Sequence, residues 1–202
     1  MRCELISWNT VYRLAERLSL SILDSGFRPE VIVAVARGGY VPARILCDFL
    51  DLYHLTSIRV VHYASGARKQ PEARVTDSIC TDIGNRRILI VDDVSDTGDT
   101  YEAAITHLQD FQPREIRTAV LLHKTPAKDQ PDVMARRVVK WRWLIDPWAV
   151  SEDLGGFIAR MSPKPRDAGE IGRRLEAEYG LKLPAARLKL LARLLSQRGI
   201  ID

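Results

Sequence analysis

Apolar positions in the first half of the chain repeat with the periods of helices and strands in alternation. From Trp8 to Asp24 the apolar side chains recur at i, i+3, i+4, i+7 and i+11, which predicts an amphipathic helix ending near Ser25-Gly26. The next run, Val31 to Ala36, is apolar throughout and shows no alternation. Such a run predicts a central strand that is covered on both faces.

The same alternation continues down the chain and predicts an α/β fold. Pro42 suits a first helical turn, and the apolar stripe after it predicts a second helix. We expect a mostly parallel, twisted sheet flanked by helices on both faces, because alternating strands and helices form right-handed crossovers. The small, polar and basic stretch from Ala64 to Arg74 predicts a long exposed loop that could act as a lid. The other predicted elements are strands over Ile58–Tyr63, Arg87–Val91, Arg117–Leu122 and Val138–Ile145, and a helix over Thr100–Phe111.

The character of the chain changes after its last tryptophan. Gly155-Gly156 and then Ser162-Pro163-Lys164-Pro165 predict a linker. Beyond the linker, Ala168–Tyr179 and Pro184–Gln197 predict two helices joined through a glycine. We therefore divide the chain into a main domain, residues 1–160, and a small C-terminal helical extension, residues 161–202.

Composition places the chain among ordinary soluble globular proteins, with 46% apolar and 28% charged residues. No apolar stretch approaches the roughly 20 residues of a membrane helix, and the N-terminus has no apolar signal core. The three cysteines form no Cys-x-x-Cys pair, which predicts free thiols in a reducing compartment. We expect a cytoplasmic protein without a membrane partner.

The charge balance alone leaves two classes of partner open. The chain has 30 basic and 26 acidic residues, and its pI is near 9.1. Such an excess suits a nucleic-acid surface, and it suits a pocket for a polyanionic small molecule equally well. The choice between them has to come from motifs.

The segment from Ile88 to Thr100 carries the clearest chemistry. A predicted buried strand delivers two adjacent carboxylates, Asp92 and Asp93, at its carboxyl end, where open α/β sheets bind ligands. The turn after them offers backbone N–H groups and three hydroxyls at the start of a helix, an arrangement that binds phosphate. Either fragment alone has a simpler explanation, as a solvated strand end or as a helix cap. Joined on one strand, turn and helix, they indicate a site for a sugar phosphate.

Three other segments join a predicted strand to polar or aromatic groups. Ala36-Arg37-Gly38-Gly39 offers N–H groups and a guanidinium to an anion, although such a run alone also suits a plain turn. Lys124 leaves a strand, where a lysine is ordinarily a surface side chain with a buried stem. Alternation would put Trp141 and Trp143 on one face of a strand, either as core or as a flat surface for a base.

The run from Asp92 to Thr100 resembles the signature with which type I phosphoribosyltransferases bind 5-phosphoribosyl-1-pyrophosphate (PRPP). The resemblance spans residues 8–148 and implies the fold, the PRPP donor and a dependence on Mg²⁺. It implies that Asp92 and Asp93 hold the ribose hydroxyls with Mg²⁺ beside them, and that Asp96 is the catalytic base for the purine N7 proton. Asp99 departs from the small or neutral residue of many relatives. The residues implied to hold the 5′-phosphate are Ser95, Asp96, Thr97, Gly98, Asp99 and Thr100.

The same resemblance assigns the other segments. Arg37, Gly38 and Gly39 are similar to the family's pyrophosphate loop, in which a non-proline cis peptide is frequent, and we expect one at Arg37–Gly38. Arg68 and Lys69, in the predicted lid, would reach the pyrophosphate. In the 6-oxopurine branch of the family, and above all in its xanthine–guanine enzymes, residues matching these contact the base: Lys124 at the C6 oxygen, Trp143 by stacking, and Leu144 and Asp146 at the purine edge.

The sequence therefore predicts a phosphoribosyltransferase of purine salvage that acts on guanine, xanthine or hypoxanthine, as a homodimer. Transfer to another base is an alternative, and so is a regulator of transcription that senses PRPP or a nucleotide on the same fold. A regulator could use the basic side chains of the C-terminal helices to bind nucleic acid. The same helices carry seven leucine or isoleucine residues that better suit packing, so we expect no nucleic-acid partner.

Overall fold

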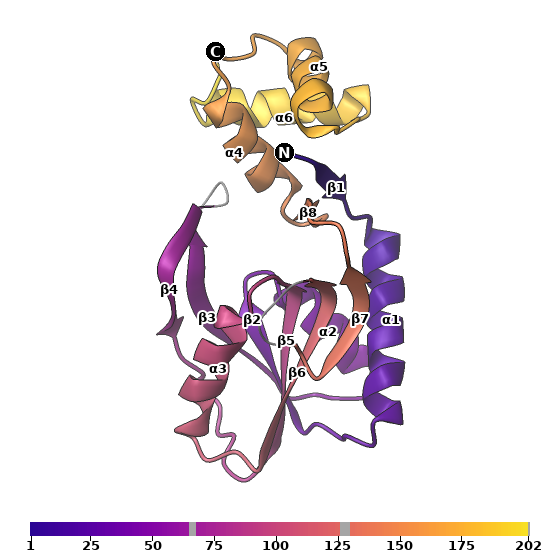
Figure 1. Cartoon of the computed structure of the whole chain (residues 1–202), viewed down its shortest axis with the longest axis vertical. Helices are drawn as coiled ribbons and strands as arrows, with labels where there is room; N and C mark the ends of the chain where they lie inside the picture. Colours follow the sequence, from indigo (N-terminus) through magenta and orange to yellow (C-terminus); the bar gives the residue numbers. More distant parts are fainter. Residues whose placement is uncertain (65–67, 126–129, 202) are drawn as a thin grey trace. The chain divides into compact units, whose positions relative to one another are not determined.

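The computed structural model describes residues 1–64, 68–125 and 130–201. For residues 62–64 and 68–72 it describes the backbone but not the side chains. Within these residues no helix is long and apolar enough to cross a membrane. The chain forms two compact units, a larger one of residues 9–63 and 69–141 and a smaller one of residues 1–8, 64–68 and 142–202. The elements are β1 Cys3–Leu5, α1 Trp8–Asp24, β2 Val31–Ala36, α2 Tyr40–Phe49, β3 Leu55–Ala64, β4 Arg68–Asp77, β5 Arg87–Ser95, α3 Asp99–Gln109, β6 Glu115–Lys124, β7 Val133–Val138, β8 Trp143–Ile145, α4 Val150–Arg160, α5 Ala168–Tyr179 and α6 Ala185–Gln197 (Figure 1).

The larger unit is built on a six-stranded sheet with the order β4-β3-β2-β5-β6-β7. The pairs β2–β3, β2–β5, β5–β6 and β6–β7 are all parallel, which confirms the predicted α/β fold. In a parallel sheet all carboxyl ends meet at one edge. The ends of β2, β5 and β6 therefore bring the segments after them together.

Both faces of the central strands are covered, as the unbroken apolar runs predict. Val33 and Ile90 pack on one face with Tyr101, Ala104 and Leu108 of α3. Their neighbours Ile32 and Leu89 point to the other face, because side chains alternate along a strand, and they are fully buried as well. Burial on both faces explains why β2 and β5 lack the alternation of a half-exposed strand.

The predicted loop from Ala64 to Arg74 is wrong over most of its length. The structure has a strand there instead, β4, which lies beside β3 at the edge of the sheet. An edge strand needs no apolar face and accepts Pro71, and this explains why its polar composition resembled that of a loop. The predicted lid over this stretch is therefore not a loop, and residues 65–67 lie outside the described residues.

The single predicted strand Val138–Ile145 is also wrong, because two strands replace it. The first, β7, belongs to the large sheet, and its two arginines hide it from an apolar pattern. The second, β8, pairs in parallel with β1 at the N-terminus, in a separate two-stranded sheet. Trp141 lies between the two strands, so it does not share a strand face with Trp143.

The smaller unit packs α4, α5 and α6 around its own apolar core. Phe157, Ile171, Leu175 and Leu195 are fully buried in that core. The glycine pair predicted as linker lies inside α4, where a Cβ on Gly155 would come within 3.2 Å of Leu195, so glycine lets the two helices approach closely. The predicted helices α5 and α6 are confirmed. The division into a main domain, residues 1–160, and a C-terminal extension, residues 161–202, stays a prediction.

Candidate active site

The turn after β5 has the geometry of an anion-binding helix start. Gly98 takes a left-handed conformation with φ +95°, which favours glycine, and α3 begins at the next residue. The first N–H groups of α3 have no partner within the helix and carry its positive end. Thr97 Oγ1 donates a hydrogen bond to Asp99 Oδ2 over 2.8 Å. The unusual Asp99 is thereby tied to Thr97.

The two carboxylates at the end of β5 are held by backbone N–H groups. Asp92 Oδ1 accepts from the N–H of Asp93 over 2.9 Å, and Asp93 Oδ1 accepts from the N–H of Val94 over 2.7 Å. Asp92 is buried and Asp93 is half-buried. Their charge reaches α3, where burial and then Asp92 and Asp93 raise the pKa of Tyr101.

The glycine pair after β2 lies against the same strand end. A Cβ on Gly38 would stand 2.1 Å from Asp93 Oδ2, and one on Gly39 would stand 2.4 Å from the Val91 carbonyl oxygen. Only glycine allows backbone to approach this closely, so the Arg37-Gly38-Gly39 turn sits directly beside the Asp93 carboxylate. The non-proline cis peptide is Ala36–Arg37, one bond before the predicted Arg37–Gly38.

Lys124 and Asp96, which lie 28 residues apart, form an ion pair. Lys124 Nζ lies 3.2 Å from Asp96 Oδ2, and the two side chains are 5% and 27% exposed. The pair forms because β5 and β6 run in parallel with Ser95 opposite His123, so the next residues, Asp96 and Lys124, follow side by side. Lys124 is therefore not the surface lysine that its residue type alone would suggest.

The aromatic ring of Trp141 lies beside Lys124. The Trp141 ring centroid lies 5.2 Å from Lys124 Nζ, a cation–π distance, and the Trp141 side chain is 53% exposed. The sequence offered this tryptophan, together with Trp143, as core or as a flat surface for a base, and assigned the base contact to Trp143. The signal that could have found it is the single cluster of three tryptophans.

The other predicted base-binding residues belong to the smaller unit. Trp143 and Leu144 form β8 opposite β1, and the backbone N–H of Trp143 donates to the Arg2 carbonyl over 3.0 Å. Asp146 is buried, and its carbonyl accepts from the N–H of Ala149. The assignment of Trp143, Leu144 and Asp146 to the base stays a prediction. The same holds for Arg68 and Lys69, whose side chains lie outside the described ones.

Comparison with known proteins decides the family. The model of the phosphoribosyl transferase domain matches residues 4–153. The chain belongs to the phosphoribosyltransferase family. A xanthine-guanine phosphoribosyltransferase of Ruegeria sp. (strain TM1040) is 32% identical over 153 residues, which cover 71% of this chain and 83% of the relative.

Solved structures support the family assignment. The purine phosphoribosyltransferase from Pyrococcus horikoshii Ot3 matches with a TM-score of 0.62 and 34% identity, over 73% of this chain and 94% of the other. The xanthine-guanine-hypoxanthine phosphoribosyltransferase of Helicobacter pylori matches with a TM-score of 0.63 and 26% identity, over 74% and 95%. Each of these matches leaves about a quarter of this chain uncovered.

A buried polar pair, Ser95 and His123, lies at the carboxyl ends of β5 and β6. The two residues are register partners on β5 and β6, with 4% and 0% exposure, and their side chains point to the same face of the sheet. Within the described part of the chain, neither Ser95 Oγ nor either ring nitrogen of His123 has a hydrogen-bond partner. Burial, and then Arg137, lower the pKa of His123.

This lowered pKa predicts a loss of stability in acid. The unfolded chain holds His123 at its ordinary pKa of 6.5 and therefore binds more protons than the folded chain just below that pH. The free energy of unfolding should fall as pH drops below 6.5, by up to about 1.4 kcal/mol per pH unit, until the pH passes the lowered pKa of the folded state. Urea unfolding at several pH values measures this slope. The slope should become shallower in His123→Leu and stay unchanged in His54→Gln, a control at an exposed histidine; equal slopes in all three proteins would contradict the prediction.

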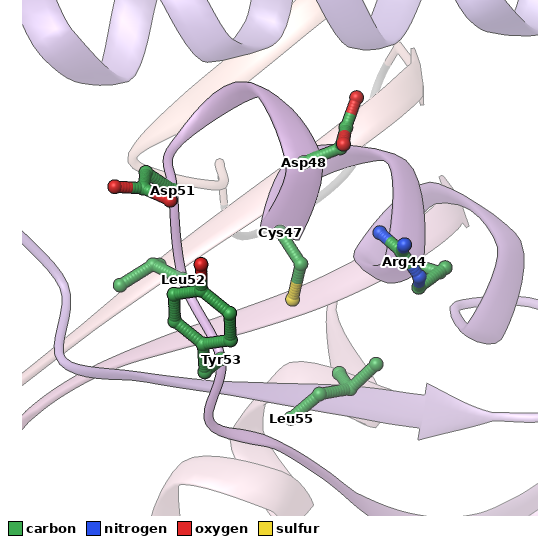
Figure 2. Close-up of a pocket in the computed structure, with 7 residues that line it drawn as sticks. All are labelled: Arg44, Cys47, Asp48, Asp51, Leu52, Tyr53 and Leu55. Carbon is green, nitrogen blue, oxygen red and sulfur yellow. The ribbon is translucent and has the colours of Figure 1, made fainter.

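The larger unit also has a pocket of about 320 Å³ away from this site (Figure 2). It lies between the end of α2 and the start of β3, which is the amino edge of the parallel sheet, whereas the phosphate turn lies at the carboxyl edge. Burial raises the pKa of the Cys47 thiol, so Cys47 is a poor nucleophile. Figure 2 shows the Asp48 and Asp51 carboxylates directed away from that sulfur. The pocket has no part in the chemistry proposed below. Its lining is Arg44, Cys47, Asp48, Asp51, Leu52, Tyr53 and Leu55.

Proposed function

We propose that this protein transfers the 5-phosphoribosyl group of PRPP to a 6-oxopurine base. The observation that carries the proposal is the ion pair of Lys124 with Asp96 at the edge where the phosphate turn begins. A 6-oxopurine presents N7 and O6 side by side on one edge. A lysine that donates to O6 and a carboxylate that accepts from N7–H match that edge. Adenine carries an amino donor at C6 and would face the lysine with the wrong group.

The donor would be held by the elements around the end of β5. The first N–H groups of α3 and the residues from Ser95 to Thr100 suit the 5′-phosphate. The fixed carboxylates of Asp92 and Asp93 suit the ribose hydroxyls. Arg37 and the N–H groups of the adjoining glycine turn suit the pyrophosphate, because a guanidinium binds phosphate oxygens in pairs.

The carboxylate pair also suits Mg²⁺. Magnesium prefers oxygen ligands and is commonly held by one or two carboxylates together with substrate oxygens and water. Asp92 and Asp93 offer such oxygens at one strand end, and we propose that they hold the ion. When bound, Mg²⁺ neutralises negative charge on the pyrophosphate.

The reaction would exchange one bond at C1 of the ribose for another. The C1–O bond to pyrophosphate breaks as the bond from C1 to N9 of the purine forms, and pyrophosphate leaves with the electron pair. N9 loses a lone pair to the new bond, and the N7 proton then passes to Asp96. Arg37 stabilises the charge that develops on the leaving group, and Lys124 fixes the base below C1.

A spectrophotometric assay with PRPP, Mg²⁺ and a panel of bases tests the function. Guanine, xanthine or hypoxanthine should be converted to a nucleoside monophosphate with release of pyrophosphate, whereas adenine, uracil and orotate should not react. Conversion of a base without an oxygen at C6 would overturn the assignment of the acceptor. If the protein converts none of the bases in the panel, the proposed activity is overturned.

Lys124→Ala is expected to weaken base binding selectively. A hydrogen bond to a charged group contributes about 1.5–3 kcal/mol, so the KM for the purine should rise by about 10- to 100-fold while the KM for PRPP stays nearly unchanged. Steady-state kinetics with each substrate varied in turn separates the two constants. Lys140→Ala, at an exposed lysine before Trp141, is the matched control and should change neither. An equal rise in both constants for Lys124→Ala would contradict its role at O6.

We further propose that the enzyme acts in the cytoplasm as a homodimer. Size-exclusion chromatography with light scattering on the full chain tests the oligomeric state. A monomeric mass at the concentrations of the assay, together with full activity, would remove the dimer from the proposal.

A further inference from the structure

The C-terminal helices carry a charge that the proposed reaction does not use. Residues 161–202 hold nine basic and five acidic side chains, a net charge of +4, which equals the net charge of the entire chain. The matched family domain ends at residue 153, before this segment begins. The net positive charge of the protein is therefore carried by residues 161–202, and residues 1–160 are neutral overall.

The excess is concentrated on one helix, α6. Its sequence, Ala185–Gln197, contains no acidic residue, and Arg198 caps its end. At 100° per residue, the exposed side chains fall within about two fifths of the helix circumference. Lys189 and Arg193 lie near the middle of this exposed α6 stripe, which consists of Ala185, Ala186, Lys189, Leu190, Arg193, Ser196 and Gln197.

The basic side chains of α6 differ from those of α5 in what surrounds them. On α5, Arg174 pairs with Glu178 over 2.9 Å, and in the turn that follows Lys182 pairs with Glu176 over 3.0 Å. Lys189 and Arg193 form no ion pair with any residue for which the structure gives a side chain. The α6 stripe is thus a positive surface whose two central charges have no ion-pair partner among the described side chains.

The sequence argument against a nucleic-acid partner was that the leucine and isoleucine residues of these helices better suit packing. The structure confirms packing for Ile171, Leu175, Leu191 and Leu195, which are buried in the core that α4, α5 and α6 share. Because the apolar side of α6 is buried inside the unit, its basic side is the one exposed to solvent.

We propose that the exposed α6 stripe binds the sugar-phosphate backbone of double-stranded nucleic acid. Lysine and arginine bind phosphate, and small and amide side chains such as Ala186 and Gln197 allow a helix to approach the duplex. Two helices joined by a short turn with a left-handed glycine, here Gly180, are also the scaffold on which many proteins present a second helix to a groove (Figure 1).

Two other classes of partner fit the stripe less well. A protein interface has a core that is poor in charge and rich in aromatic residues, whereas this stripe has charged residues at its centre and a single exposed leucine, Leu190. A helix that lies in a membrane surface needs an exposed apolar face. The apolar face of α6 is buried by its own unit.

Fluorescence anisotropy with the full chain tests the proposal. The probes are labelled duplexes of about 20 base pairs, one of DNA and one of RNA, and the matching single strands. Backbone recognition predicts a Kd of about 10⁻⁶ to 10⁻⁴ M for a duplex at physiological salt, weakening steeply as salt rises. The DNA and RNA arms decide which duplex is preferred, and no binding to either, or stronger binding to the single strands, would overturn the proposal.

Paired charge variants separate the stripe from net charge. K189Q/R193Q should weaken duplex binding about 10-fold and lower the salt slope by about 2, because two phosphate contacts are lost. The control R174Q/K182Q removes the same charge from residues already paired with glutamates, and it should bind as the wild type does. If duplex binding weakens equally in both variants, net charge alone explains the effect, and the proposed role of the α6 stripe is overturned.

Two further arms test the excluded partners. Poly-glutamate and vesicles containing anionic phospholipid should compete poorly with the duplex for the protein. If poly-glutamate competes as well as a duplex does, the stripe binds polyanions in general, and the proposal is overturned. If the vesicles do, the partner is a membrane surface, and the proposal is overturned as well. Purine phosphoribosyltransferase turnover should be unchanged in both variants, and an unchanged circular dichroism spectrum should show that their C-terminal helices are folded. Because turnover and duplex binding are measured separately, this inference can fail while the proposed enzymatic function stands.

Discussion

Asp96→Asn is expected to lower kcat by about 10²- to 10⁴-fold, the usual contribution of a general base, while PRPP binding persists. Asparagine keeps the shape and can still accept a hydrogen bond from Lys124, but its neutral amide cannot take up the purine N7 proton. The phosphate turn depends chiefly on backbone N–H groups, so the donor should still bind. Steady-state kinetics and calorimetry with PRPP and Mg²⁺ measure the two effects.

The control for this variant is Asp110→Asn, at the exposed end of α3. It makes the same chemical change at the far end of α3 from Asp96 and should leave both kcat and PRPP binding unchanged. Wild-type turnover in Asp96→Asn would remove Asp96 from the role of base. Loss of PRPP binding along with turnover would show instead that the Asp96 carboxylate shapes the phosphate turn.

Gly38→Ala is expected to reduce kcat/KM for PRPP by about 10²-fold, because displacing a reacting group by about 1 Å can cost that much. The new Cβ would overlap Asp93 Oδ2 at 2.1 Å, so either the carboxylate or the pyrophosphate turn has to move. Both are proposed to hold the donor, and the KM for the purine should change far less. Kinetics with PRPP varied at saturating purine measure the effect.

The matched control for Gly38→Ala is Gly84→Ala, whose Cβ would meet its nearest atom, in the Asp82 carboxylate, at 3.2 Å. Urea unfolding of both variants separates a local change at the site from loss of the fold. A Gly38→Ala protein that unfolds as the wild type does and keeps its kcat/KM for PRPP would contradict the proposed geometry of the turn.

The strands that carry the site were predictable because they are central. A strand covered on both faces has an unbroken apolar run, and β2 and β5 have such runs ending in Arg37 and in the Asp92–Asp93 pair. What the sequence could not supply is the register between strands. The ion pair of Lys124 with Asp96 depends on Ser95 lying opposite His123, a contact between segments that no local pattern links.

The elements that were missed share a physical cause. β4 and β7 are edge strands, and polar residues such as Arg74, Asp77 and Arg137 are exposed on them, so these strands lack the apolar signal of a central strand. β1 has three residues and exists through its pairing with β8, which lies about 140 positions away. The glycine pair in α4 signals a linker locally, and only contact with Leu195 explains it as a packing position.

The two borders of the large sheet constrain how copies of this protein can associate. The border strand β4 exposes Arg74 and Asp77, and β7 at the opposite border exposes Arg137. Charged side chains on border strands discourage a second molecule from extending the sheet by backbone hydrogen bonds. We therefore expect the proposed homodimer to form through helices or loops, because joining two sheets at these borders would bring charged side chains together.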